Sequence, residues 1–425
     1  MAKIIPFRGL LYNPDRVSAN EVLAPPYDII SPEHKDILYG KSPYNIVRVD
    51  FGRKLPGDDH ITNRYSRAKT SLAQWEKEGV MVRDDMPCYY ACEVAYELPG
   101  NKKKNLRGIL ALLKIEELGQ GVYPHEATHS KPKADRLNLM KACLANVSPI
   151  YSLYNSPARI TSSLLEGLGG DPHISAQDPD GAVHSLYKID DPEKIALITQ
   201  ELYDKSVFIA DGHHRYEVAL EFKREMDAMG CPNEFFPAED ACASRPWDYV
   251  LMFLANMADE GITILPTHRM IKGIAGKEEI FSKLAADFTF QTISGATDVL
   301  EIVAAGEKNT FGLYLYGEDS WHVLRYREND RLKDLPPALG HLDVVVLHEL
   351  ILKRDLGITD IAYEMDVREA MGRVRRGDFD GVFFLNPTGV QDVERVALSG
   401  LRMPPKSTYF YPKLLTGMVI NSFKH

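Results

Sequence analysis

The chain has 425 residues, of which 44% are hydrophobic and 26% are charged, and this composition is typical of a globular protein with two or three cores. A formal net charge of −10 argues against a general nucleic-acid-binding protein, because such proteins present basic surfaces to the phosphate backbone. No run of about 18 apolar residues is present, so we expect no membrane partner. The N-terminus lacks a long apolar stretch and no two cysteines form a C-x-x-C pair, which together predict a cytoplasmic protein.

Periodic patterns along the chain predict intermixed helices and strands. Apolar spacings of three and four predict a helix over 64–79, and two alternating runs joined by "PGNKKKN" predict a β-hairpin over 88–115. Further helices are expected over 135–146, 192–203 and 342–354, and further strands over 148–154, 207–210 and on both sides of the turn at 317–319. The sequence therefore predicts a mixed α/β (α+β) fold, which we divide into sections 1–115, 116–275 and 276–425.

The stretch "YPHEATHSKPK" contains the H-E-x-x-H pattern of zinc hydrolases at residues 125–129. Zinc chemistry requires both histidines on one face of a continuous helix. Glycines upstream and Pro132 downstream leave room for about two helical turns at most. A zinc hydrolase that uses His125, Glu126 and His129 is therefore a minor alternative, beside the simpler interpretation that these polar residues form a loop and cap the next helix.

A second stretch, "VFIADGHHRYEVALEFKREMDAMG" at residues 207–230, is typical of a buried strand, a tight polar turn and an amphipathic helix. The turn begins with Asp211 and lies at a helix N-terminus, where backbone amides and the helix dipole favour phosphate. Glycine at such a point lets a ligand approach the backbone, and arginine matches phosphate oxygens with its planar fork. The simpler interpretations are that Asp211 only caps the helix and the histidines lie at the surface, or that His213 and Glu217 bind a metal ion.

The box "ADGHHRYE" is similar to the D-G-H-H-R signature of the ParB and sulfiredoxin-like superfamily, in particular of its free serine kinases. Most of the chain resembles the family called domain of unknown function 1015, through "LAPPYDIIS", "PHEATHSKPKADRLNLMKACLANVSPIY", "FIADGHHRYEVAL", "NMADEGITILPTHR" and "MPPKSTYFYPK". The resemblance implies a ParB-like catalytic core with additional N- and C-terminal α/β sections. It also implies a kinase that phosphorylates free L-serine to O-phosphoserine with ATP or ADP.

Roles for individual residues follow from the resemblance and from the box. In the free serine kinases a glutamate upstream of the box is the general base, and here the upstream glutamate is Glu126. We predict Glu126, Asp211 and His214 as catalytic residues, with Asp211 as a ligand of Mg²⁺. The predicted nucleotide-binding residues are Lys133, Gly212, His213, His214 and Arg215. The serine carboxylate is assigned to Arg136, and the substrate site also includes His125 and Thr128.

Alternatives remain open at this point. Relatives of the ParB fold bind CTP, so a nucleotide-binding switch without kinase activity is a second interpretation. "PTHR" at 266–269 and "KST" at 406–408 are further candidates for contacts to the nucleotide. Tyr27 and Asp28 in "APPYD" are candidates for the substrate amine, although a Pro-Pro turn before a helix is a sufficient structural reason for that stretch.

Overall fold

The computed structural model describes residues 3–127, 130–230, 245–274, 276–306, 308–327 and 330–424. The chain divides into two compact units, each of which is described by itself. Unit 1 comprises Met1–Pro124, Thr128–Ile262 and Pro412–His425, and unit 2 comprises His125–Ala127 and Thr263–Tyr411.

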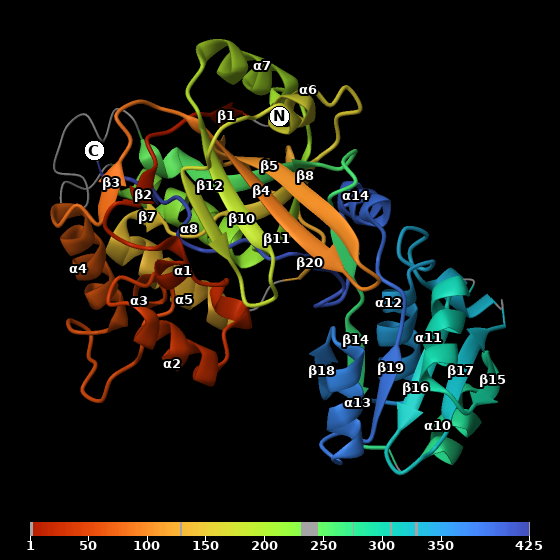
Figure 1. The fold of residues 1–425 in the computed structure, drawn as a ribbon. Helices are drawn as coiled ribbons and strands as arrows, with labels where there is room; N and C mark the ends of the chain where they lie inside the picture. Colours follow the sequence, from red (N-terminus) through yellow and green to blue (C-terminus); the bar gives the residue numbers. More distant parts are fainter. Residues whose placement is uncertain are drawn as a thin grey trace. The chain divides into compact units, whose positions relative to one another are not determined.

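Unit 1 is built on a nine-stranded mixed sheet (Figure 1). Its strands are β1 (Ile4–Ile5), β4 (Tyr89–Leu98), β5 (Lys102–Lys114), β6 (Val122–Tyr123), β8 (Ile150–Tyr154), β9 (Ile174–Gln177), β10 (Val183–Ile189), β11 (Val207–Asp211) and β12 (Tyr249–Asn256). The order is β6-β11-β8-β12-β5-β4-β10-β9, with β1 also paired to β5. β11 runs parallel to β6 and β12 runs parallel to β8, whereas the other neighbours are antiparallel. Two small sheets pair β2 (Leu10–Tyr12) with β3 (Met81–Arg83), and β7 (Ala145–Asn146) with β21 (Asn421–Ser422).

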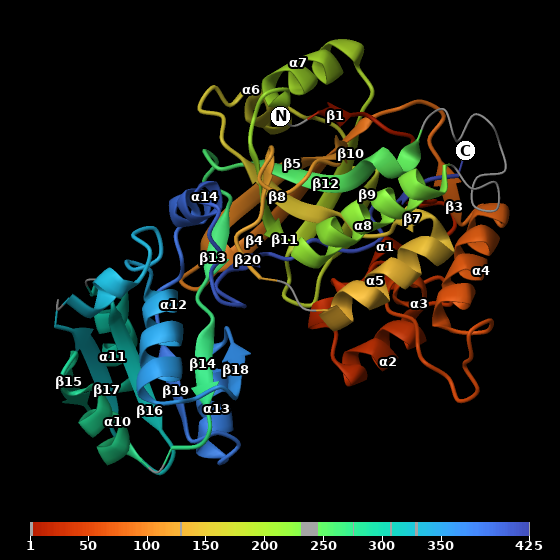
Figure 2. The same ribbon diagram turned by 180° about the vertical axis from the view of Figure 1, so that it is seen from behind.

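The helices of unit 1 cover this sheet. They are α1 (Ala19–Val22), α2 (Pro32–Lys41), α3 (Val47–Asp50), α4 (Arg64–Lys77), α5 (Ser130–Cys143), α6 (Ile160–Glu166), α7 (Pro192–Leu202) and α8 (His213–Met229), with 3₁₀ turns η1 (Tyr27–Ile29) and η2 (Pro246–Asp248). α8 packs against β8 and α5, and α4 packs against α5 in turn (Figure 2). In Figure 1, α6 and α7 appear above the sheet and α2 to α5 below it. The buried face of α8 joins the main apolar core through Tyr216, Phe222 and Met226.

Unit 2 contains a six-stranded antiparallel sheet of order β15-β17-β16-β19-β14-β18. Its strands are β14 (His268–Ile271), β15 (Phe288–Ile293), β16 (Thr310–Leu315), β17 (Trp321–Tyr326), β18 (Ile361–Glu364) and β19 (Gly381–Phe384), and a separate pair joins β13 (Thr263–Leu265) to β20 (Tyr409–Tyr411). The helices are α10 (Lys277–Leu284), α11 (Ala296–Ala305), α12 (Asp343–Val345), α13 (Val367–Arg375) and α14 (Val390–Leu398), with the 3₁₀ turn η3 (Asp330–Asp334) and the π-helix η4 (Val346–Asp355).

The predicted mixed α/β class is confirmed, whereas the ParB-like character of the core stays a prediction. The helix expected over 64–79, the hairpin over 88–115 and the strand-turn-helix over 207–230 are present as α4, as β4 with β5, and as β11 with α8. α5 begins earlier than the expected helix and contains Pro132 near its start, where proline is tolerated because the first amides lack helical partners. The predicted division into three sections stays a prediction. β12 pairs with β5 across the boundary at 115/116, and Thr263–Tyr411 belongs to unit 2 together with His125–Ala127.

No helix in the described part of the chain is long and apolar enough to cross a membrane.

The contact between β5 and β12 gives a test of the sheet. A Cβ atom at Gly108 would lie 2.5 Å from Phe253 Cζ and 2.6 Å from the Leu254 carbonyl oxygen. We expect Gly108→Ala to lower the free energy of unfolding by about 1–3 kcal/mol, because the added methyl overpacks this contact. Gly40→Ala in α2 meets no atom within 4 Å and is the matched control, expected to stabilise by about 0.5–1 kcal/mol. Urea unfolding followed by tryptophan fluorescence measures both, and equal stabilities would contradict the packing described.

Candidate functional site

The D-G-H-H-R box connects β11 to α8 in unit 1, as the sequence predicts. Gly212 lies between the two elements with φ 93° and ψ 29°, the left-handed region that glycine adopts without strain. A Cβ atom at Gly212 would lie 2.7 Å from Nε of Arg215. Glycine is therefore required here by the backbone conformation and by the side chain that lies over it.

A β-bulge precedes the glycine. Ile209 is paired with Ser152 of β8 and Asp211 with Tyr151, so Ala210 is an extra residue in β11. Bulges bend a strand and change the direction of the side chains next to them. The N-cap position of α8 is Gly212, so Asp211 lies one residue before the cap.

Asp211 is held between two cations. Its Oδ1 accepts a hydrogen bond from Nζ of Lys413 at 3.1 Å, and its Oδ2 accepts one from the Arg215 guanidinium at 2.9 Å. The side chains of Lys413, Arg215 and Asp211 are only 11%, 14% and 21% exposed, so these ion pairs are screened less than surface pairs. Lys413 was not predicted as a site residue, although it ends the stretch "MPPKSTYFYPK" and so had a sequence signal.

Arg215 also donates to the Pro149 carbonyl oxygen and, at 3.4 Å, to Oγ of Ser148. Its guanidinium is thus engaged with acceptors of the protein, and a phosphate contact at Arg215 would replace one of them. His213 is buried and His214 is half-buried. The interpretation of both histidines as surface residues is therefore wrong for His213.

The residues at Asp211 do not fit the predicted Mg²⁺ site. Mg²⁺ in phosphoryl-transfer sites is held by carboxylate oxygens together with substrate phosphates. Both carboxylate oxygens of Asp211 are bonded to cationic side chains, so a metal ion would have to displace Lys413 or Arg215. Among the described residues, no group of three or more His, Cys, Asp or Glu side chains is arranged to hold a metal ion.

Lys133 lies on α5 and donates to Oε2 of Glu217 on α8 at 3.0 Å. This ion pair connects α5 to α8. It also occupies the Glu217 carboxylate, which would be a ligand in the alternative metal site formed with His213. Lys133 is about one-third exposed, so its ammonium also remains accessible to water.

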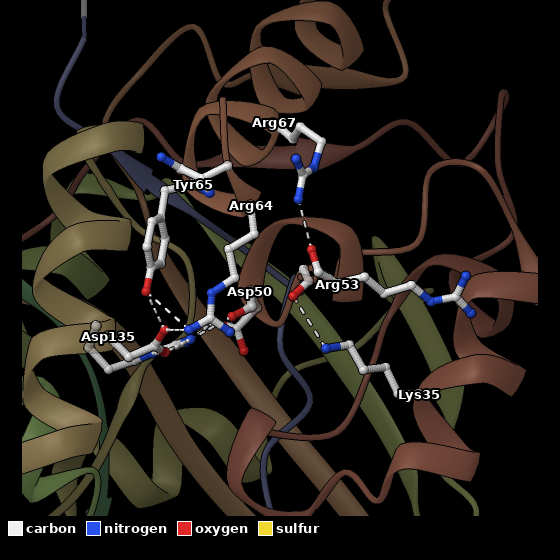
Figure 3. A network of polar contacts seen from close by, with 10 residues as sticks. Lys35, Asp50, Arg53, Arg64, Tyr65, Arg67 and Asp135 are labelled. Atoms are coloured by element: carbon white, nitrogen blue, oxygen red, sulfur yellow. Dashed lines mark hydrogen bonds and ion pairs between the residues drawn. The ribbon is translucent and has the colours of Figure 1, made fainter. Parts of the chain in front are cut away.

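Arg136 is buried in a network of carboxylates. Its guanidinium donates to Oδ1 of Asp50 at 2.8 Å, to the Asp50 carbonyl oxygen at 2.7 Å and to Asp135 at 2.9 Å, and it lies 4.0 Å from the centre of the Tyr27 ring. Figure 3 shows Arg64 and Tyr65 directed at the same Asp135 carboxylate. A substrate carboxylate at Arg136 would have to displace one of these partners. The geometry therefore favours a structural role for Arg136 over the predicted binding of serine.

A cavity of about 40 Å³ lies between this network and the box. Asp50, Arg136, Ser148 and Arg215 contribute polar groups to its wall. Oδ2 of Asp50 is buried and accepts no hydrogen bond from the described residues, and burial raises the pKa of this carboxyl although Arg136 and Arg215 lower it. Arg136 and Arg215 thus both interact electrostatically with the buried Asp50 carboxyl group. This interaction links the box to the segment around Asp50.

Glu126 belongs to unit 2, where it forms a parallel β-bridge with Met403. Its Oε1 accepts hydrogen bonds from the Ser407 amide at 3.0 Å, the Thr408 amide at 3.1 Å and the Thr408 hydroxyl at 3.2 Å. None of the described residues donates to its Oε2. The "KST" motif therefore orients the Glu126 carboxylate by one oxygen.

His125 is fully buried, and its Nε2 lies 2.8 Å from the hydroxyl oxygen of Thr408. His125 and Glu126 precede α5, which begins at Ser130, and they lie next to a β-bridge rather than in a helix. The helical condition of the zinc motif is not met at these two residues. Thr128 and His129 lie outside the described residues.

The "PTHR" motif places a buried arginine in unit 2. Arg269 donates to the carbonyl oxygens of Thr267 and, at 3.0 Å, of Lys406, while no described residue accepts a hydrogen bond from its Nε. In the described part of unit 2 no carboxylate forms an ion pair with it. Burial lowers the pKa of Arg269 to about 10, and Tyr363 and Glu126 oppose this shift. The "PTHR" and "KST" motifs therefore lie next to each other, joined by the hydrogen bond from Arg269 to the Lys406 carbonyl oxygen.

The sequence model of the family described as "Protein of unknown function (DUF1015)" matches residues 4–345. No curated protein matches the chain.

Several solved structures are similar to the chain at low identity. A conserved hypothetical protein from Pyrococcus furiosus has 14% identity and a TM-score of 0.35, over 74% of this chain and 94% of that chain. A free serine kinase in complex with AMP has 13% identity and a TM-score of 0.36, over 76% of this chain and 95% of that chain. SbnI with a C-terminal truncation from Staphylococcus aureus has 13% identity and a TM-score of 0.35, over 72% and 85%. TM-scores this low do not by themselves establish a shared fold or a shared activity.

The non-helical backbone at His125 and Glu126 leads to a prediction about zinc binding. We expect the purified protein to contain no stoichiometric zinc, because His125 and Glu126 lack the helical geometry of the motif. Elemental analysis of protein purified without chelators measures this. Zinc at one equivalent, lost in both His125→Ala and His129→Ala, would contradict the expectation.

Proposed function

We propose that this chain, which belongs to the family described as protein of unknown function (DUF1015), binds a nucleotide by its phosphates at the D-G-H-H-R box and phosphorylates free L-serine. The observation that carries the proposal is the junction of β11 and α8, where the helix N-terminus at Gly212 lies beside the ion pairs of Asp211 with Arg215 and Lys413. The choice of serine as acceptor rests on the resemblance of the box to that of the free serine kinases.

Three features of the box support phosphate binding. α8 has 17 residues, so its N-terminus carries the full positive end of a helix dipole. Because Gly212 has no side chain, the Arg215 guanidinium fits over the start of α8 and places a cation at the helix N-terminus. Lys413 and Arg215 place two cationic side chains at the junction, where both donate to the Asp211 carboxylate. In the proposal, Asp211 is a positioning residue that fixes both cations.

The proposed reaction conserves its atoms and charge as follows. The serine hydroxyl oxygen forms a bond to the terminal phosphorus of ATP or ADP, the bond from that phosphorus to its bridging oxygen breaks, and ADP or AMP leaves. The hydroxyl proton passes to Glu126, the proposed general base. A carboxylate with one oxygen anchored by "KST" and the other without a donor among the residues that the structure describes is suited to that role. No step is assigned to Mg²⁺, because the residues at Asp211 do not fit it.

The first test addresses the base. Incubation with L-serine and ATP or ADP should give O-phosphoserine, detected by mass spectrometry, and Glu126→Gln should reduce turnover by about 10²-fold or more while nucleotide affinity stays near wild type. Glu369→Gln, a half-exposed glutamate of unit 2, is the matched control and should keep full activity. Nucleotide binding without any phosphorylated amino acid would favour the nucleotide switch instead. Activity of Glu126→Gln within a few-fold of wild type would remove Glu126 from the mechanism.

The second test addresses the box by calorimetric titration with ATP, ADP and adenosine. Lys413→Gln and His214→Ala should each weaken ATP and ADP binding by about 10-fold or more, because a charged hydrogen bond to phosphate contributes about 1.5–3 kcal/mol. Adenosine binding should not change, since adenosine has no phosphate. Lys353→Gln, an exposed lysine of unit 2, is the control for loss of one positive charge. Unchanged ATP affinity in both box variants would exclude phosphate binding at this junction.

A further inference from the structure

Unit 1 has a second basic site, in a pocket of about 500 Å³ that contains no residue of the box. Helices α2, α3 and α4 and the loop after α3 form its walls. Four arginine side chains line it, namely Arg48, Arg53, Arg64 and Arg67. Figure 3 shows three of them together with Lys35, whose ammonium donates to the Gly52 carbonyl oxygen at 3.2 Å.

The charges around this pocket do not balance. Three of the arginines are paired with one carboxylate each: Arg53 with Asp36, Arg64 with Asp135, and Arg67 with Asp58. With Arg48, and with Lys35, which lies beside the pocket and does not line it, five cations stand against these three carboxylates. The pocket therefore carries a surplus of two positive charges in a chain whose net charge is −10.

Arg48 has no carboxylate partner among the described residues. It donates to the carbonyl oxygens of Tyr39 at 2.8 Å and Ser42 at 3.3 Å, which fixes its guanidinium at the end of α2. Arg48 and Arg53 both lie over the Tyr39 ring, with 4.5 and 4.1 Å between the guanidinium carbon and the ring centre. Cations held in place in this way lose little conformational entropy when an anion binds.

The environment of Lys35 is an independent sign of positive potential. The pKa of Lys35 is lowered, first by burial and then by the charges of Arg64 and Arg53. The neighbouring carboxylates, Asp36 and Asp135, oppose this shift without cancelling it. An anion in the pocket would relieve the repulsion among these cations.

We propose that this pocket binds a small molecule that carries two linked phosphate groups. The charge surplus matches an anion of at least two negative charges, and guanidinium groups bind phosphate oxygens in pairs. A pocket of about 500 Å³ has the size of a small-molecule site and is too small for a nucleic-acid chain. The site is distinct from the box, so its test does not depend on the proposed kinase activity.

The test is calorimetric titration of the full-length His214→Ala protein with inorganic pyrophosphate, because this background weakens binding at the box. Gly40 lines the pocket in α2, and a Cβ atom there would meet no atom within 4 Å. Gly40→Glu should therefore place a carboxylate among the arginines and weaken pyrophosphate binding by at least about 10-fold. Gly40→Gln adds the same bulk without charge and should weaken binding less.

Gly169→Glu is the matched control, because Gly169 lies in another loop, also with no atom within 4 Å, and adds the same charge. It should bind pyrophosphate like the parent protein. Equal affinities of the parent and Gly40→Glu proteins, or no pyrophosphate binding in the parent, would overturn the proposal. Citrate, a tricarboxylate, serves as the comparison ligand, and citrate binding as tight as that of pyrophosphate would overturn the assignment to phosphate. Arg53→Gln, which alters a 43% exposed side chain, should repeat the loss seen in Gly40→Glu.

Discussion

The ion pairs of Asp211 with Arg215 and Lys413 are the constraint on which the candidate site depends. They join the end of a strand, the first turn of a helix and a segment from the far end of the sequence. Arg215 extends the connection to the Pro149 carbonyl oxygen before β8. Loss of the Asp211 carboxylate would remove a negative charge that both largely buried cations contact, which is unfavourable. The shape of the box is therefore maintained by contacts that no short segment can make alone.

The features that sequence predicts well here are local. The α4 helix, the β4–β5 hairpin and the β11–Gly212–α8 junction follow from spacing and turn residues within about 10–25 neighbouring positions. Pairings between distant residues leave no such pattern. Lys413 is 202 residues from Asp211, and Ser407 is 281 residues from Glu126, so both contacts were missed although each residue lies in a noted stretch. The same reason explains why β5 and β12, assigned to separate sections, share one sheet.

Arginine shows most clearly why residue type alone does not give a role. Arg136 was assigned to a ligand because it follows two lysines in a polar segment, yet it is buried against Asp50 and Asp135. Arg269 is also buried, but its hydrogen bonds within the described part of the chain go to carbonyl oxygens. The free energy of burying a guanidinium depends on which partner meets it, and that partner comes from elsewhere in the chain. Sequence gives the number of cations, whereas the fold decides which are neutralised.

The discontinuity of unit 1 also has a consequence for how the protein is made. Residues 412–425 return to unit 1 after the whole of unit 2, and they bring Lys413 to Asp211, pair β21 with β7, and stack Phe423 on Phe222 of α8. A chain leaves the ribosome from its N-terminus, so the nine-stranded sheet and α8 are synthesised long before the segment that completes them. Until residue 413 is synthesised, the box lacks the ion pair between Asp211 and Lys413. The mature arrangement at the start of α8 is therefore among the last parts of the protein to form.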